Sequence, residues 1–176
     1  MPLTMNQVTN NTLIIKGRTL TFDTQFYPND IEKVRKLTSE VGVFSDEEIY
    51  VSGEMVEDAL KDSEYCSFIF LRDAEQNLVA YTSFGEIPFT NKRFDLYWIA
   101  VAKEWQNQKL ASLILARTEN EIRKLGGKKI YAETSGTESY QAARNFYLKS
   151  GFTKVAEIAD YYKDGDNKVL FVKELD

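Results

Sequence analysis

The sequence predicts an α/β protein with one mixed, mostly antiparallel sheet of about seven strands and with helices on both faces. Strand-like and helix-like segments follow one another along the 176 residues in the order strand, two helices, three strands, helix, strand, helix, two strands. Short polar loops join several neighbouring strands, which favours antiparallel hairpins. One helical segment instead joins two strands as a crossover, which implies a right-handed parallel pair near the centre.

A first strand over residues 12–22 precedes two predicted helices. Pro28-Asn29-Asp30 is a helix-start signal, because Asn and Asp side chains accept hydrogen bonds from free N–H groups. The apolar residues after it recur at helical spacing: Ile31, Val34, Leu37 and Val41. Ser45 and Glu48 have the spacing of a capping box, so a second helix is expected from there to about Asp62.

The next three strands are expected over residues 65–71, over residues 78–87 and from Phe94 onward. The polar segment 73–77 makes the first two a hairpin. In the third strand two sets of residues alternate, Phe94, Leu96, Trp98 and Ala100 with Asp95, Tyr97, Ile99 and Val101. A helix is then expected from about Gln106 to Gly126-Gly127.

The C-terminal part supplies the remaining elements. Residues 128–134 predict a strand, and residues 139–150 predict a helix that Gly151 ends. Residues 152–159 and 168–173 predict the two closing strands.

The composition is that of a single folded domain, expected over residues 12–176 after a flexible N-terminal segment, residues 1–11. Apolar residues make up 43% of the chain, which is enough for a filled core. The net charge of −5 argues against nucleic acid as a partner. The sequence has neither an apolar run of membrane-spanning length nor a signal-peptide pattern, so no membrane partner is expected and the cytoplasm is the expected compartment.

Missing and rare residue types exclude whole classes of chemistry. The chain has no histidine, which removes Ser-His-Asp and Cys-His catalysis and histidine-ligated zinc, and no metal is expected. Its single cysteine, Cys66, can form no intrachain disulfide and lies in an apolar run typical of a buried strand.

The turn before the predicted central helix, Glu104 to Ala111, contains no bulky aliphatic residue before Leu110. A polar turn that opens a helix leaves N–H groups free at the positive end of the helix dipole. The sequence therefore predicts a phosphate-bearing ligand near residues 106–112. A nucleotide-binding α/β protein would use the same kind of turn, but the chain lacks both G-x-x-x-x-G-K-[ST] and G-x-G-x-x-G.

Three motifs, in this order, resemble the GNAT superfamily of acetyl-CoA-dependent N-acetyltransferases over roughly residues 12–175. The family's loop reads Gln/Arg-x-x-Gly-x-Gly/Ala; here Gln106 and Ala111 match, but Lys109 stands in place of the first Gly. The segment Ala143–Phe152 matches A-x-x-F-Y-x-x-x-G-F without departure, and residues 160–168 resemble the family's closing hairpin. The resemblance implies the GNAT fold, in which the central parallel strands splay apart.

The resemblance also implies acetyl-CoA as co-substrate and indicates where it binds. Its pyrophosphate would be bound by backbone N–H groups of the loop and of the start of the helix: Gln106, Asn107, Gln108, Lys109, Leu110, Ala111 and Ser112. The pantetheine arm would bond along Ile99, Ala100 and Val101, and Asn145 and Tyr147 would complete the cofactor site. Lys109 is tolerated if its φ is negative, whereas a positive φ costs roughly 1 kcal/mol. Alternatively, its ammonium contacts a phosphate.

Acetyl transfer to an amine needs a neutral amine, a stabilised oxyanion and a proton for the leaving thiolate. The resemblance implies Tyr147 as the general acid, with a core aromatic under the cofactor as the alternative. Ordinary phenol and thiol pKa values leave this proton transfer uphill by about 2 kcal/mol. Asp95 and Glu133, with Glu86 as a third choice, are candidate bases, and each is otherwise an ordinary surface carboxylate. A strand N–H of residues 99–101 would hold the oxyanion.

The acceptor is the least determined part. The carboxylates together favour a cationic amine, carried by a small molecule or by a peptide or protein. Aromatic residues are expected around it, with a core position as the alternative for Trp98: Tyr81, Tyr97, Trp98, Tyr161 and Tyr162. Because Lys109 departs from the family loop, an acyl-CoA-binding module without turnover is the alternative function. Exposed strand edges near the C-terminus would allow a homodimer.

Overall fold

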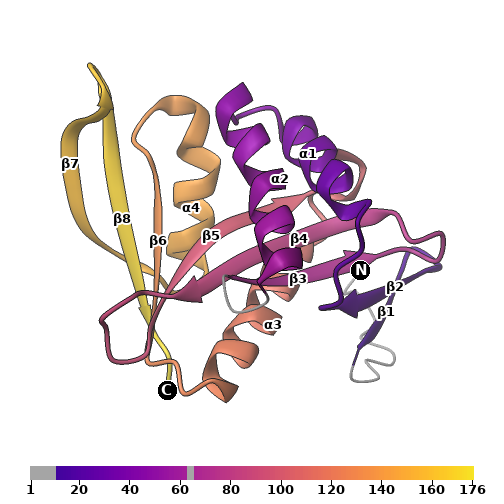
Figure 1. Cartoon of the computed structure of the whole chain (residues 1–176). Coiled ribbons are helices and arrows are strands. Elements are labelled where there is room, and N and C mark those ends of the chain that lie inside the picture. Colours follow the sequence, from indigo (N-terminus) through magenta and orange to yellow (C-terminus); the bar gives the residue numbers. More distant parts are fainter. Residues whose placement is uncertain (1–10, 63–65) are drawn as a thin grey trace.

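The computed structural model describes residues 11–62 and 66–176, which form one eight-stranded sheet with helices on both faces (Figure 1). The strands are β1 (Thr12–Ile15), β2 (Arg18–Asp23), β3 (Ser67–Arg72), β4 (Leu78–Glu86), β5 (Arg93–Val101), β6 (Lys129–Ser135), β7 (Thr153–Lys163) and β8 (Asp166–Glu174). The helices are α1 (Asp30–Val41), α2 (Asp46–Lys61), α3 (Leu110–Lys124) and α4 (Gln141–Lys149), with short 3₁₀ helices η1 (Lys103–Trp105) and η2 (Glu138–Tyr140).

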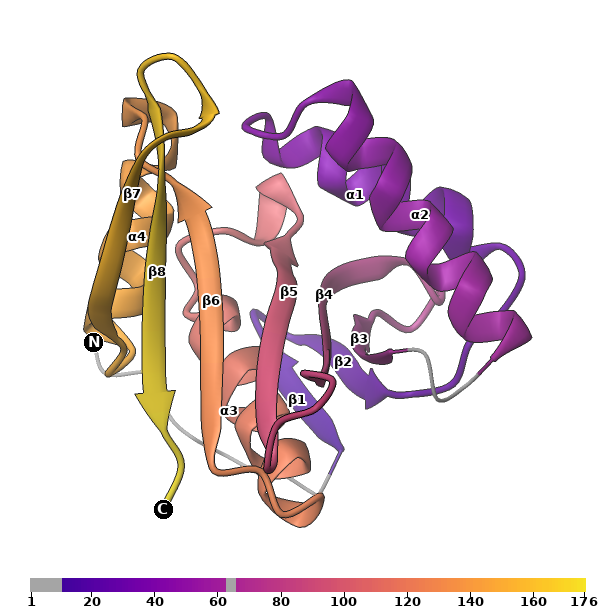
Figure 2. The same cartoon turned by 60° about the vertical axis from the view of Figure 1, so that its left-hand side comes forward.

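The strand order is β1-β2-β3-β4-β5-β6-β8-β7, and every neighbouring pair is antiparallel except β5–β6. The predicted mixed sheet with a central parallel pair is therefore confirmed. β5 and β6 lie side by side at one end and diverge toward the other (Figure 2). The α1–α2 loop and the β7–β8 hairpin flank the open end of this pair (Figure 2).

The sheet has one strand more than predicted, because residues 12–22 form a hairpin and not a single strand. Lys16 and Gly17 have φ values of 51° and 75°, the paired positive values of a tight two-residue turn. The predicted flexible segment 1–11 lies outside the described residues except for Asn11, whose carbonyl accepts an N–H from β2 at 2.7 Å. Tyr65, the predicted start of the next strand, also lies outside them.

Adjacent residues of β4 show which helices cover each face of the sheet. The Tyr81 hydroxyl lies 2.6 Å from that of Thr38 on α1, whereas the Thr82 hydroxyl lies 2.7 Å from that of Thr118 on α3. Because successive strand residues point to opposite faces, α1 and α3 pack on opposite sides. None of the helices in the described part of the chain is long and apolar enough to span a membrane.

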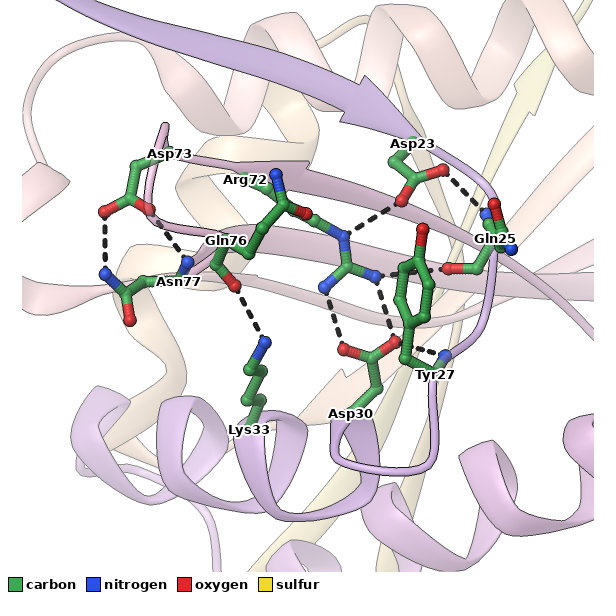
Figure 3. A network of polar contacts seen from close by, with 9 residues as sticks. All are labelled: Asp23, Gln25, Tyr27, Asp30, Lys33, Arg72, Asp73, Gln76 and Asn77. Carbon is green, nitrogen blue, oxygen red and sulfur yellow. Dashed lines mark hydrogen bonds and ion pairs between the residues drawn. The ribbon is translucent and has the colours of Figure 1, made fainter.

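The two predicted helix starts differ in outcome. Ser45 and Glu48 make both bonds of the predicted capping box. Asn29 makes no side-chain cap, and Asp30 turns into the core instead, where it binds Arg72 of β3 (Figure 3). The guanidinium donates to the two Asp30 oxygens at 2.8 and 2.9 Å, and its Nε donates to Asp23 at 3.1 Å. This network fixes the start of α1 against the sheet.

Candidate active site

The parallel strands β5 and β6 separate halfway along their length. They pair from Arg93 with Lys129 up to Leu96 with Ala132; in the described sheet, β5 continues beyond that point with β4 alone and β6 with β8 alone. The space between residues 97–101 and 133–135 is called the wedge below. Backbone groups that face the wedge have no strand partner there, so a bound ligand can use them.

A bulge at Tyr97 lies at the point where the wedge begins. Consecutive residues of β4 face Leu96 and Trp98, so Tyr97 is an extra residue on β5. Leu96 and Trp98 therefore point to opposite faces, and the unbroken alternation predicted for this strand is wrong beyond Leu96. Gly85 makes room for the bulge, since a Cβ there would lie 2.8 Å from the Tyr97 hydroxyl. A glycine inside a strand is the sequence signal that indicates such a feature.

The wedge leads to the N-terminus of α3, which begins at Leu110 and not near Gln106 as predicted. Between β5 and α3 the chain forms η1 and a loop in which Asn107 and Lys109 both have a φ of 61°. Left-handed residues cannot continue a helix, so the helix starts later than the polar pattern suggested. Gln106 Nε2 donates to the Val101 carbonyl at 3.3 Å and attaches the loop to the end of β5.

The first turn of α3 presents free N–H groups. In the described chain no side chain caps this helix. The first residues of a helix have no intrahelical acceptor for their N–H groups, and here these are Leu110, Ala111 and Ser112. These donors stand at the positive end of the dipole of a 15-residue helix, which suits a phosphate.

Lys109 has the conformation that was expected to be unfavourable. Its φ of 61° and ψ of 14° lie in the left-handed region, so the costly one of the two cases considered from the sequence applies. The family's glycine fits this conformation without strain, whereas a lysine costs roughly 1–2 kcal/mol there.

Lys109→Gly should therefore stabilise the protein. Relief of the strain, less the greater entropy of glycine in the unfolded chain, leaves a gain of roughly 0.5–1 kcal/mol. Urea unfolding at pH 7 measures it. Lys16→Gly is the matched control, because Lys16 also has a positive φ, 51°, but lies in the β1–β2 turn. Both variants should gain stability; a loss with Lys109→Gly alone would mean that the Lys109 side chain makes stabilising contacts.

Tyr147 of α4 lies in an aromatic cluster and is 7% exposed. Its ring centroid lies 5.4 Å from that of Phe152 and 5.5 Å from that of Phe171. Burial raises the pKa of Tyr147 to about 12. Among the described residues its hydroxyl has no hydrogen-bond partner, so it can donate to a ligand.

The two candidate bases lie on one face of the sheet near the wedge. Asp95 pairs with Tyr131, and Glu133 follows two residues along β6 on the same side. The Lys168 ammonium makes an ion pair with Glu133 and lies 4.4 Å above the Tyr161 ring. Burial, and then the negative charge of Glu133, raise the pKa of Asp95, and Lys168 offsets only part of this effect.

Other predicted residues fall into different places. Glu86 lies at the opposite end of β5 from the wedge, and its carboxylate contacts the Lys92 ammonium at 2.8 Å. Tyr81 is 1% exposed and belongs to the core, so its predicted place in the acceptor wall is wrong. Asn145 is exposed on α4 and accepts a hydrogen bond from Gln141 at 2.9 Å.

Sequence reasoning missed a contact between segments that flank the open end of the wedge. The Tyr140 hydroxyl of η2 lies 3.3 and 3.4 Å from the Glu48 oxygens at the start of α2. Burial, and then the charge of Glu48, raise the pKa of Tyr140. These residues are 92 positions apart, and no local sequence pattern indicates such a pair.

Comparisons with known proteins agree with this geometry. The model of the acetyltransferase (GNAT) family matches residues 31–152. A Desulfovibrio desulfuricans protein assigned to the GNAT acetyltransferases is 33% identical, with a TM-score of 0.85 over 89% of this chain and 99% of the other. An aminoglycoside 6'-N-acetyltransferase complexed with coenzyme A has 16% identity and a TM-score of 0.69, covering 88% of this chain and 97% of the other.

The Escherichia coli ribosomal-protein-S18-alanine N-acetyltransferase has 17% identity and a TM-score of 0.68, covering 89% of this chain and 94% of the other. No curated protein sequence matches the chain significantly. The family match covers more than half of the chain, and the Desulfovibrio relative agrees along almost its whole length. The chain therefore belongs to the acetyltransferase (GNAT) family.

Proposed function

We propose that this protein transfers the acetyl group of acetyl-CoA to a primary amine by direct attack in a ternary complex. The acceptor is a cationic amine of a small molecule or an amino group of a peptide or protein. The observation that carries the proposal is the wedge, which leads to an uncapped helix N-terminus. A long thiol ester with a diphosphate at its far end has the shape and charge that such an arrangement binds.

The residues present fit coenzyme A. The N–H groups of Leu110, Ala111 and Ser112, with the loop Gln106 to Lys109, would bind the pyrophosphate. The strand edge at Ile99, Ala100 and Val101 would bind the pantetheine amides, as a missing neighbouring strand would. Tyr147 and Asn145 would complete the site from α4.

For the chemistry, Asp95 takes a proton from the incoming ammonium, directly or through water, and so frees the nitrogen lone pair. The nitrogen then bonds to the thioester carbon, and a strand N–H of residues 99–101 stabilises the oxyanion. As the carbon–sulfur bond breaks, Tyr147 gives its proton to the sulfur. The nitrogen, now positively charged, passes its second proton to the Tyr147 phenolate, directly or through water, which leaves a neutral amide and a free thiol. With a Tyr147 pKa of about 12, proton transfer to a thiolate with an ordinary thiol pKa is uphill by roughly 5 kcal/mol. This exceeds the value of about 2 kcal/mol that an ordinary phenol pKa gives. The proton must therefore be donated while the carbon–sulfur bond breaks.

Calorimetric titration with acetyl-CoA, paired with measurement of released thiol over an amine panel, tests the proposal. We expect binding, and thiol release with at least one cationic amine. Binding without release for any amine would instead favour the alternative, an acyl-CoA-binding module without turnover. The left-handed Lys109 is the observation that favours this alternative.

Asp95→Asn should lower kcat/KM for the amine by roughly 100-fold or more, because a positioned general base contributes about that much. Glu86→Gln is the control, since Glu86 lies away from the wedge and is exposed. A rate for Asp95→Asn equal to that of the control would remove Asp95 from this role.

The same variant has a predicted pH dependence of stability. The pKa of Asp95 is raised in the folded state, so the folded protein holds this proton more tightly than the unfolded chain does. The free energy of unfolding of the wild-type protein therefore falls as the pH rises from the ordinary pKa of an aspartic acid through the raised pKa. Asp95→Asn cannot ionise, so its Tm minus that of wild type should grow as the pH is raised above about 4. Thermal unfolding at several pH values measures this difference, and a difference that shrinks with pH would contradict the assigned shift.

A further inference from the structure

The end of β6 is held from two sides, and neither side is β5. From α4, the Arg144 Nη1 donates to the carbonyls of Ser135 and Thr137 at 2.6 and 2.7 Å. Its Nη2 donates to the Gln141 side chain at 2.8 Å, which keeps the guanidinium in place. Charge-assisted bonds of this kind are roughly twice as strong as neutral ones.

The second attachment comes from β8. The Ser135 hydroxyl lies 2.5 Å from Asp166 Oδ1, and the Gly136 N–H donates to the Asn167 carbonyl at 2.7 Å. Gly136 permits this close approach, since a Cβ there would lie 3.1 Å from the Asn167 side chain. In the described structure these bonds of residues 135–137 run to α4, to β8 or within their own loop.

A strand end with unpaired backbone groups next to another strand end would gain bonds by pairing with it. For β6 that pairing would extend the contact with β5 and close the wedge. Arg144 supplies the carbonyls with other partners, and its planar fork can reach two of them at once.

We propose that Arg144 is a positioning residue that keeps the wedge open and so sets the affinity for the pantetheine arm. This inference rests on the proposed function. A direct contact between Arg144 and a cofactor phosphate is the competing role. It fits less well, because both Nη atoms of the guanidinium already donate to protein oxygens.

The experiment compares Arg144→Met, Arg144→Lys and a control, Lys149→Met, which removes an exposed cation from the same helix. Each variant is assayed with acetyl-CoA and with S-acetylpantetheine, which lacks the nucleotide and its phosphates. For Arg144→Met we expect KM to rise about 10- to 100-fold, by the same factor for both donors, with the amine KM unchanged. The donor KM values of Arg144→Lys should lie between those of wild type and Arg144→Met. The donor KM values of Lys149→Met should equal those of wild type.

Three results would overturn the inference. A rise confined to acetyl-CoA would identify a phosphate contact. A loss of thermal stability with both donor KM values unchanged would identify a purely structural role, and Arg144→Lys provides this reading if Arg144→Met does not fold. A wild-type protein that neither binds nor uses acetyl-CoA would overturn the proposed function as well, and that failure appears before any variant is made.

Discussion

Asp30→Ala is expected to destabilise the protein by about 3–5 kcal/mol, because it leaves the buried Arg72 guanidinium without its main partner. Both side chains are inaccessible, with Asp30 0% and Arg72 1% exposed. Asp30 also accepts the Tyr27 N–H at 2.8 Å, so one substitution removes three hydrogen bonds (Figure 3). The midpoint of thermal unfolding should fall on the order of 10 °C.

Glu32→Ala is the matched control on the same helix. Glu32 also pairs with an arginine, Arg35, at 2.9 Å, but its side chain is 78% exposed. An exposed ion pair contributes at most about 1 kcal/mol to stability, so the free energy of unfolding of Glu32→Ala should stay close to that of wild type. A double variant, Asp30→Leu with Arg72→Met, should recover much of the loss, because no unpaired charge is then buried. Equal effects of Asp30→Ala and Glu32→Ala would contradict the importance of burial.

The fold could be predicted largely from local patterns, and one error of that prediction has a local cause while the other has a long-range one. The Ser45–Glu48 capping box, the 73–77 hairpin loop and the crossover between β5 and β6 depend on residues close in sequence. Residues 12–22 were misread as one strand because the Lys16-Gly17 turn places a lysine at a positive φ. Asp30 was read as part of a cap, since its partner Arg72 lies 42 residues away.

The candidate site could be predicted less well, because it is made by departures from regular patterns. Strand divergence leaves no mark in the composition of β5 or β6, and only the family resemblance led to that expectation. The bulge at Tyr97 could be inferred from Gly85 only once the pairing of β4 with β5 was known. Arg144 occupies an unspecified position of the A-x-x-F-Y-x-x-x-G-F segment, and its role depends on carbonyls at the end of β6 and in the loop after it.

Tyr147→Phe is expected to lower kcat by roughly 100-fold or more while leaving acetyl-CoA affinity nearly unchanged, because a positioned general acid contributes about that much. Stability should not fall, since the Tyr147 hydroxyl has no partner among the described residues and the ring contacts with Phe152 and Phe171 remain. With a pKa of about 12 the phenol stays protonated over the working range, so wild-type kcat should show no loss up to about pH 10.

Tyr81→Phe provides the opposite pattern. Tyr81 is also buried, but its hydroxyl bonds to Thr38 at 2.6 Å, and it lies on β4 beneath α1. Removing that hydroxyl should cost about 1 kcal/mol of stability and leave kcat unchanged. Steady-state kinetics and urea unfolding of both variants separate the roles. If Tyr147→Phe keeps the wild-type kcat, the leaving thiolate takes its proton from elsewhere, and Tyr147 acts only as an aromatic packing residue.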